Sequence, residues 1–228
     1  STRLPGKVLK EIIAKPMIIH QLIRTKLSHY IDEIILLTSD LESDDKLASI
    51  IELNGFNLFR GDKDNVLKRF FDCAEILNLD DNDVIVRLTG DCPLHDSMII
   101  DESIKAFLEN DCDYLANCIE PIYPDGFDVE VFSFKSLKKA FSGATKKSEL
   151  EHVTPYIRNS NKFKIKNLEK EKCYSELRLT VDEEKDFLLV KAIYEYFEKS
   201  IFSFNEIIDF LNNNKKLKES NLDIQRNE

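Results

Sequence analysis

Short apolar runs alternate with amphipathic segments through the first half of the chain. Three such runs, of the kind that form strands buried on both faces of a parallel sheet, occupy residues 33–38, 56–59 and 84–88. Around them, apolar residues recur every three or four positions, which predicts helices over 16–28, 43–54, 65–79 and 97–109. This alternation predicts an α/β fold with a doubly wound, mostly parallel sheet that has helices on both faces.

The second half of the chain has a more β-like pattern. It predicts strands over 113–119, 127–134, 163–168 and 177–181, and helices over 135–142, 149–159 and 184–198. A last helix begins at Ser203, which forms a capping box with Glu206. We expect 113–170 to form a small β-rich lid or dimerisation insert and 214–228 to form a polar tail that frays. No repeat or Pro/Gly linker divides residues 1–228, so a single domain is predicted.

The composition argues against several classes of function. Lys and Arg number 32 and Asp and Glu 42, which gives a formal charge of −10. Proteins that bind nucleic acids or anionic membranes are usually basic, so neither partner is expected, although a local cation cluster can hold a phosphate ligand. No apolar run is long enough for a membrane span. The cysteine count of 5 is odd and includes no C-x-x-C pair, which favours reduced thiols and a cytoplasmic protein.

Acidic residues follow two of the predicted strands. Asp91 comes after the strand at 84–88, and Asp182 directly follows the strand at 177–181. Ligands of open α/β sheets bind at the carboxyl ends of strands, and two carboxylates that converge there suit an octahedral Mg²⁺. The alternative is that each aspartate only caps the next helix.

The first seven residues, STRLPGK, place two cations around a Pro-Gly turn. Arg3 and Lys7 either hold an anionic ligand such as a phosphate, or belong to a solvated, frayed terminus. A charge pair at 4 Å is worth about 1 kcal/mol in water and about 4 kcal/mol at an effective dielectric constant near 20. These cations therefore matter only if they lie in a crevice.

Six motifs occur together in order: STRLPGKVLKEI, RGDKDNVLKRF, VRLTGDCPLHD, YPDGFDVEVFS, EHVTPYI and RLTVDEEKDF. Together they resemble the cytidylyltransferases of the spore-coat polysaccharide biosynthesis F type, relatives of the CMP-acylneuraminate and CMP-ketodeoxyoctonate synthetases. The resemblance runs from residue 1 to about 200. It implies a Rossmann-like nucleotidyltransferase fold, a homodimer, and Mg²⁺-dependent transfer of CMP from CTP to a hydroxyl of an acidic sugar, with release of pyrophosphate.

The resemblance also implies roles for individual residues. Ser1, Arg3 and Lys7 match the phosphate-binding loop. The nucleotide is expected near Thr38, Asp40, Arg60 and Arg69, and near Thr89, which stands where sister families carry a Gln that contacts cytosine. Asp91 matches a metal ligand, and Asp182 matches the first aspartate of a D-x-x-x-D pair that ends at Asp186.

For the acceptor, the candidates are Asp128, Glu130, His152, Tyr156 and Arg178. An arginine is a natural clamp for a carboxylate. The alternatives are a solvated strand face for the two acidic residues, a dimer interface for His152 and Tyr156, and a strand-edge ion pair for Arg178. In the implied mechanism a sugar hydroxyl attacks the α-phosphorus in line, while Lys7 and Arg3 stabilise the leaving pyrophosphate.

One departure from the family concerns the start of the sequence. The family begins with a central strand before the Ser-x-Arg segment, whereas this sequence begins at Ser1. We expect that strand to be missing from the sequence, or another element to fill its place, because an empty place would leave two rows of unpaired backbone groups. Two other functions stay open: a nucleotidyltransferase of the same fold for another NTP or a phosphorylated non-sugar acceptor, and an inactive nucleotide-binding module.

Overall fold

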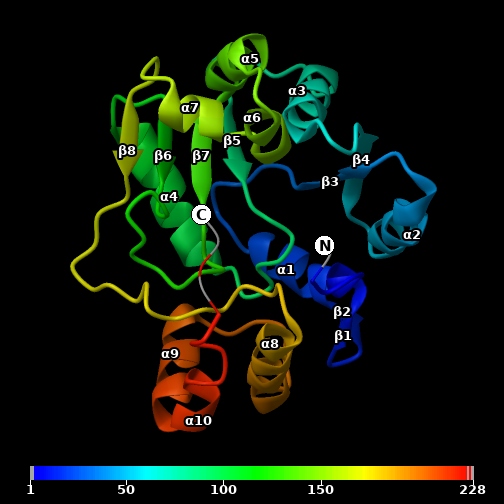
Figure 1. Cartoon of the computed structure of the whole chain (residues 1–228), viewed down its shortest axis with the longest axis vertical. Helices are drawn as coiled ribbons and strands as arrows, with labels where there is room; N and C mark the ends of the chain where they lie inside the picture. The colour runs from blue at the N-terminus through cyan, green and yellow to red at the C-terminus, as the bar shows by residue number, and fades with distance from the viewer. Residues whose placement is uncertain (1–2, 225, 227–228) are drawn as a thin grey trace.

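Helices and strands alternate along the first half of the chain, as predicted (Figure 1). The structure, a computed structural model, describes residues 3–224 and 226. In order, the elements are η1 (Lys7–Leu9), β1 (Glu11–Ile12), β2 (Lys15–Pro16), α1 (Met17–Thr25), β3 (Ile35–Ser39), η2 (Glu42–Asp44), α2 (Asp45–Leu53), β4 (Asn57–Gly61), α3 (Val66–Ile76), β5 (Val84–Arg87) and α4 (Ser97–Glu109). The short hairpin of β1 and β2 was not predicted.

The second half adds strands to the same architecture. Its elements are β6 (Tyr114–Ala116), β7 (Glu130–Ser133), α5 (Phe134–Gly143), α6 (Lys147–His152), α7 (Pro155–Asn159), β8 (Ile165–Asn167), α8 (Glu184–Phe197), α9 (Phe204–Asn213) and α10 (Lys215–Lys218). The predicted insert, 113–170, supplies β6, β7 and β8 and is therefore built into the larger sheet. Across the described part of the chain, no helix has the length and apolarity needed to cross a bilayer.

Three predictions for the second half are wrong. The helix at 149–159 is interrupted at Val153, whose φ is 70°. Residues 177–181 form no ladder strand, because their backbone bonds go to irregular segments: Leu179 N–H to the carbonyl of Asp125, and Val181 N–H to that of Asp91. The tail is ordered through α10, and Asn221 beyond it is 1% exposed.

The strands form two separate sheets beside the small hairpin. The larger sheet has the order β5-β7-β6-β8, in which β7 is antiparallel to both neighbours and β6 is parallel to β8. The smaller sheet pairs β3 with β4 in parallel, in a register that sets Leu37 opposite Phe59. Thus β3 and β5 are both edge strands.

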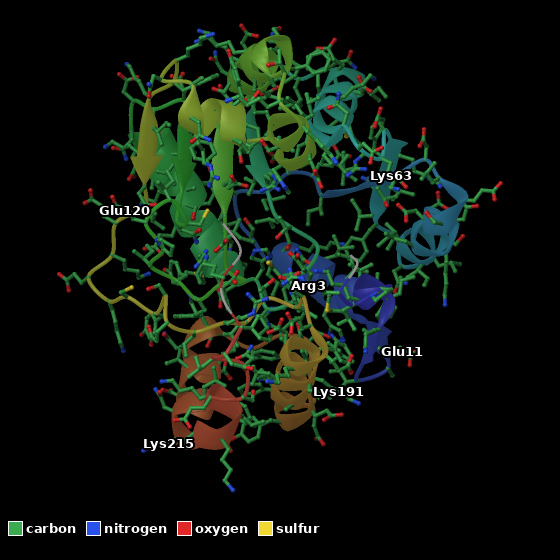
Figure 2. The ribbon with its side chains drawn as sticks, in the orientation of Figure 1. Arg3, Glu11, Lys63, Glu120, Lys191 and Lys215 are labelled. Atoms are coloured by element: carbon green, nitrogen blue, oxygen red, sulfur yellow. The ribbon has the colours of Figure 1, made fainter. Side chains whose placement is uncertain are left out.

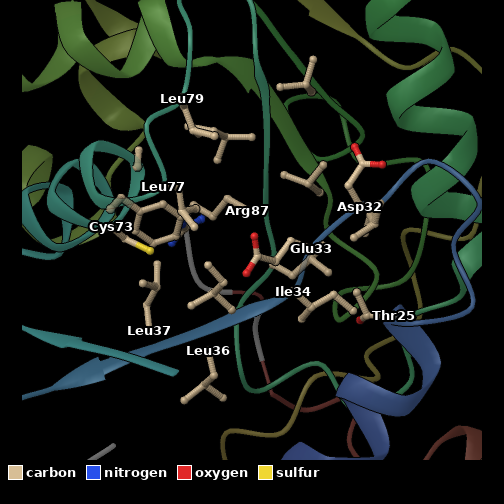
Figure 3. A pocket seen from close by; sticks show the side chains of 18 of the residues that line it. Thr25, Asp32, Glu33, Ile34, Leu36, Leu37, Cys73, Leu77, Leu79 and Arg87 are labelled. Carbon is tan, nitrogen blue, oxygen red and sulfur yellow. The ribbon is translucent and has the colours of Figure 1, made fainter. Parts of the chain in front are cut away.

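A cavity of about 780 Å³ is lined by residues of both edge strands, β3 and β5. Figure 3 shows Leu36, Leu37, Cys73 and Leu79 around this space, with Glu33 and Arg87 also at its wall. No strand among residues 3–224 and 226 pairs with the free edge of either strand. The sequence analysis offered another element as a replacement for the family's central strand. Among the described residues no element takes that place, so this alternative is wrong.

Alternating residues of β6 and β7 build the core on both faces of the larger sheet. Leu115 and Val131 pack with the apolar side of α4 and with α8 and α9 in one cluster. Tyr114, Ala116 and Phe132 belong to a second cluster, with residues of α3, α5 and α7. The two-residue period of a strand gives this division. A third cluster joins α1 and α2 to β3 and β4.

Candidate active site

Lys7 joins two acidic residues that are far apart in the sequence. Its Nζ lies 3.0 Å from Oδ2 of Asp91 and 2.9 Å from Oδ1 of Asp182. The side chains of Lys7 and Asp182 are each 11% exposed, and that of Asp91 is 28% exposed. We call this arrangement the Lys7 bridge. It places both carboxylates around the Lys7 ammonium group, at a partly buried position.

The backbone holds the two aspartates side by side independently of Lys7. The Val181 N–H donates to the Asp91 carbonyl over 2.8 Å, and the Thr180 hydroxyl donates to the same carbonyl over 3.3 Å. Neither aspartate caps the helix that follows it, because the N-cap of α4 is Asp96 and that of α8 is Glu183. The capping alternative is therefore wrong for both.

Two arginines contact the other oxygen of Asp182. Arg3 Nη2 lies 2.9 Å and Arg178 Nη2 lies 3.0 Å from Oδ2. Arg178 also pairs with Asp125 at 2.8 Å and with Asp186 at 3.0 Å. Asp186 in turn accepts the backbone N–H of Asp182, so that the D-x-x-x-D pair and Arg178 form one buried network.

Opposite charges decide the ionisation of the bridge. Burial lowers the pKa of Lys7, but Asp91 and Asp182 raise it more, so the pKa of this ammonium lies above its usual value. For Asp91 and Asp182, burial raises the pKa, yet Lys7 and the neighbouring donors hold the pKa of both carboxyl groups below the usual range. The bridge is therefore an ammonium between two carboxylates at neutral pH.

The turn before Lys7 directs it inward. Gly6 has a φ of 68° and is the N-cap of η1, a left-handed conformation that glycine adopts at little cost. Lys7 follows directly and is buried, while Arg3 is partly exposed and lies over the same aspartate. Figure 2 labels Arg3 near the middle of the molecule, among the side chains of these segments. The frayed-terminus alternative is wrong for these two cations, and Ser1 lies outside the described residues.

The other predicted nucleotide contacts lie at the ends of β3 and β4. Thr38 donates to Asp44 over 2.7 Å, and the exposed Asp40 donates its backbone N–H to Gly61. Arg60 is bound to the carbonyls of Ser39 and Leu41, and Arg69 to that of Asp62. Thr89 lines the cavity between β3 and β5, as does Arg69, and its carbonyl accepts a bond from Gln21. Of these residues, Thr89 reaches the Lys7 bridge, because its side chain hydrogen-bonds to Asp91 and helps to lower the pKa of that carboxyl group.

The acceptor candidates are divided among different environments. Asp128 accepts two bonds from Arg226, at 2.6 and 2.8 Å, and remains partly exposed. Glu130 is buried, and its carboxylate accepts hydrogen bonds from Tyr114, Thr154 and Arg87. The alternative of a solvated strand face is therefore wrong for Glu130.

The remaining three candidates also differ from one another. Arg178 is held in the acidic network beside Asp182, which extends the ion-pair alternative to three carboxylates. His152 is exposed at the end of α6. Tyr156 accepts a bond from Lys162 and packs against Gly143. No contact in the described structure joins these last two to the Lys7 bridge.

The comparison with known families decides the assignment. A family model described as cytidylyltransferase matches residues 1–226. The chain belongs to the cytidylyltransferase family. It is therefore a nucleotidyltransferase, as the six motifs predicted.

Three relatives place this cytidylyltransferase more closely. A solved cytidylyltransferase from Leptospira borgpetersenii superposes with a TM-score of 0.90 at 33% identity, covering 100% of this chain and 94% of that one. The spore coat polysaccharide biosynthesis protein SpsF of Bacillus subtilis is 32% identical over 94% of this chain and 90% of its own length. An 8-amino-3,8-dideoxy-manno-octulosonate cytidylyltransferase from Shewanella frigidimarina is 34% identical over 47% of this chain and 43% of its own. The fold is accordingly the Rossmann-like nucleotidyltransferase fold.

The donors of the Lys7 bridge fit a hard divalent cation. Asp91 and Asp182 offer carboxylate oxygens, which Mg²⁺ prefers, and both already reach one cation, the Lys7 ammonium. In the described range, no group of three or more His, Cys, Asp and Glu side chains is placed to hold a metal. Two carboxylates are nonetheless the usual protein share for a Mg²⁺ that binds with a nucleotide, since phosphates and water supply the other ligands.

The sequence analysis missed several residues that surround the candidate site. Asp125, the aspartate of the PDG turn, lies on Arg178, and burial raises its pKa to about 6. Asn221 donates to the carbonyl of Arg178 and to Asp186, and Arg226 holds Asp128. The PDG motif was a signal for Asp125. The two tail residues carried none, because a polar tail has the same composition whether or not it packs.

Proposed function

We propose that this cytidylyltransferase transfers CMP from CTP to a hydroxyl of an acidic sugar of the nonulosonic or ketodeoxy type, with release of pyrophosphate, in the biosynthesis of a surface polysaccharide or glycan. The single observation that carries the proposal is the Lys7 bridge, which gathers two carboxylates and a lysine at one position. The names of the SpsF and amino-octulosonate relatives support the polysaccharide context and the sugar acid.

The residues of the bridge have distinct roles in the proposed reaction. Asp91 and Asp182 would hold Mg²⁺, which supplies charge neutralisation at the phosphates and lowers the pKa of the attacking hydroxyl. Lys7 and Arg3, both on the N-terminal segment, bind the β- and γ-phosphates and stabilise the charge that develops on the leaving pyrophosphate. Arg178 donates to Oδ2 of Asp182, the oxygen that does not contact Lys7, and so keeps this carboxylate ionised and oriented.

The acceptor is proposed to bind beside Asp128. Its side chain is 32% exposed and paired with the 26% exposed guanidinium of Arg226, which offers both an acceptor and a donor group to a polyhydroxylated acid. Glu130 and Arg178 are proposed as supports, because their polar atoms are already bonded inside the protein. His152 and Tyr156 fit a surface contact better, since they lie on the short helices α6 and α7.

The base is proposed to be recognised near Thr89, Thr38 and Arg69, beside the cavity between β3 and β5. The carbonyl and hydroxyl of Thr89 already bond to Gln21 and Cys92, which leaves Thr89 little free hydrogen-bonding capacity to select one base. The competing function is therefore the same transfer with another NTP.

Pyrophosphate release tests the proposed function. The chain is incubated with Mg²⁺, one of CTP, UTP, GTP or ATP, and a panel of nonulosonic and ketodeoxy acids. The expected result is release that requires both CTP and an acid of the panel. Equal release with UTP or ATP would show that the enzyme does not select cytosine. CTP binding without turnover on any acid would favour an inactive nucleotide-binding module.

We further propose a cytoplasmic homodimer whose partners are CTP and the sugar acid rather than nucleic acid or membrane. The cysteines of the described chain are all free thiols, and Cys73 and Cys92 are buried. The formal charge of −10 disfavours polyanionic partners. Sedimentation equilibrium at micromolar concentration tests the dimer: a single species with the 26.5 kDa mass of one chain would overturn it.

A further inference from the structure

The Lys7 ammonium occupies the position at which a divalent cation would meet both carboxylates. It lies 3.0 Å from Asp91 and 2.9 Å from Asp182, distances of strong, charge-assisted hydrogen bonds. A metal ion that takes ligands from both residues cannot share this position with an ammonium group, because the two cations repel each other at close range. Metal binding therefore requires Lys7 to move.

The surroundings make this competition stronger. Asp182 contacts three cationic side chains, since Arg3 and Arg178 lie on its second oxygen. A divalent ion that arrives alone thus meets a pair of carboxylates whose charge is already balanced. A triphosphate changes the balance, because it brings several negative charges that the cations of the N-terminal segment can bind.

The position of Lys7 allows its side chain to move between the two carboxylates and a bound triphosphate. It lies on η1, a single turn of three residues, directly after the left-handed Gly6. Its long flexible side chain presents a point charge whose three donors can be redirected without moving the backbone. In contrast, Arg178 is 5% exposed and fixed by three carboxylates, so it remains with Asp182.

We propose that Lys7 is a counter-ion switch that makes metal binding depend on the nucleotide: without nucleotide it closes the carboxylate pair, and with nucleotide it transfers to the phosphates and opens the pair for the metal. The inference rests on the proposed roles of Asp91 and Asp182, but not on the identity of the sugar. By linkage, the nucleotide raises the affinity for metal by the same factor by which the metal raises the affinity for nucleotide.

Direct binding of Mn²⁺, measured by its electron paramagnetic resonance signal without acceptor sugar, tests the switch. Lys7→Met should bind Mn²⁺ about 10-fold more tightly than the unmodified chain in the absence of nucleotide, within the usual range of coupling between sites. Lys7→Gln, which keeps a hydrogen-bond donor but loses the charge, should do the same. Lys7→Arg should stay as weak as the unmodified chain.

Lys10→Met is the matched control, because Lys10 lies on the same segment and its ammonium pairs with the exposed Glu184 instead. It should leave the affinity for Mn²⁺ unchanged. Unchanged or weaker Mn²⁺ binding by both Lys7→Met and Lys7→Gln, with melting temperatures that show folded protein, would overturn the switch. If Lys7→Met does not fold, the Gln and Arg variants decide the question between them.

The failure of the switch can be told apart from that of the proposed function. If Asp91→Asn abolishes Mn²⁺ binding while the neutral Lys7 variants bind no better than the unmodified chain, the metal site stands and the switch is wrong. If Asp91→Asn binds Mn²⁺ normally, the metal assignment itself is wrong, and the switch falls with it.

Discussion

The backbone N–H of Val181 donates to the carbonyl oxygen of Asp91 over 2.8 Å. This bond fixes the segment before α8 against the segment after β5, and so it places Asp182 beside Asp91 by main-chain geometry. The carboxylates themselves take no part in the bond. Either side chain can therefore be changed without displacing the other.

Asp91→Asn should abolish turnover and leave the fold intact. Loss of partners in the outer shell of a metal site typically costs 10- to 100-fold, so loss of a ligand should lower kcat by roughly 100-fold or more. The melting temperature should change by less than about 4 °C, since an amide still accepts a bond from Lys7. Pyrophosphate release and thermal melting measure the two effects. Asp209→Asn, on the exposed side of α9, is the control, and near-normal activity of Asp91→Asn would contradict the metal assignment.

Much of this arrangement could be predicted from local pattern. Apolar runs and helical spacing predicted the elements around the site, and the position of Asp91 after a strand predicted that it lies at the ligand edge. The capping box of Ser203 and Glu206 is present at the start of α9, as predicted. Each of these signals depends on residues that are close in sequence.

The remaining features depend on distant partners. Residues 177–181 have the composition of a strand, but their backbone partners are loop residues, among them Asp125 and Asp91, which no local pattern identifies. Similarly, the polar tail was predicted to fray, yet Asn221 packs on Arg178 and Asp186. Buried polar contacts of this kind depend on the tertiary structure, because the residues that form them have the same sequence signature on a solvated surface.

Gly126→Ala should destabilise the protein strongly. Gly126 has a φ of +107°, and a Cβ there would lie 2.5 Å from the backbone nitrogen of Thr180, in the segment that carries Asp182. Because backbone must shift to relieve this clash, we expect a loss of more than about 3 kcal/mol in the free energy of unfolding, measured in urea.

Gly55→Ala is the matched control for this change. Gly55 also has a positive φ, +73°, but nothing lies within 4 Å of its Cβ position. It should lose only the cost of a left-handed alanine, about 1–2 kcal/mol. Equal losses for the two variants would show that the close approach to Thr180 is unimportant.

The stability contributed by Asp44 should depend on pH. Burial raises its pKa, but the hydroxyl groups of Ser39 and Thr38 and the Ser39 backbone N–H lower it more, so its pKa in the folded protein lies below the usual value. Its contribution is then fully present above the unfolded pKa of about 3.9 and is lost as the pH falls through the folded value.

Urea titrations of Asp44→Asn at several pH values test this sign. The difference in unfolding free energy between the variant and the unmodified chain should be largest near pH 7 and should shrink below pH of about 4. A difference that stays constant, or that grows in acid, would show that the ionised carboxylate of Asp44 does not stabilise the end of β3.

Amide hydrogen exchange should reveal the open edges beside the cavity. Among the described residues, β7 is paired on both sides, by β5 and β6, whereas β3 and β5 each have one partner strand. Amides of β7 should therefore exchange more slowly than those of β3 and β5, because local opening is easier at an unpaired edge. Equal protection of the three strands would mean that the edges are covered in solution.

In the proposed site, Asp91 and Asp182 hold one divalent cation together with the triphosphate. Crystals of the chain grown with CTP and Mn²⁺, measured at the manganese absorption edge, test it most directly. We expect an anomalous peak within coordination distance of both carboxylates, with Lys7 turned onto the phosphates. A manganese peak bound to neither aspartate, with Lys7 still between them, would contradict it.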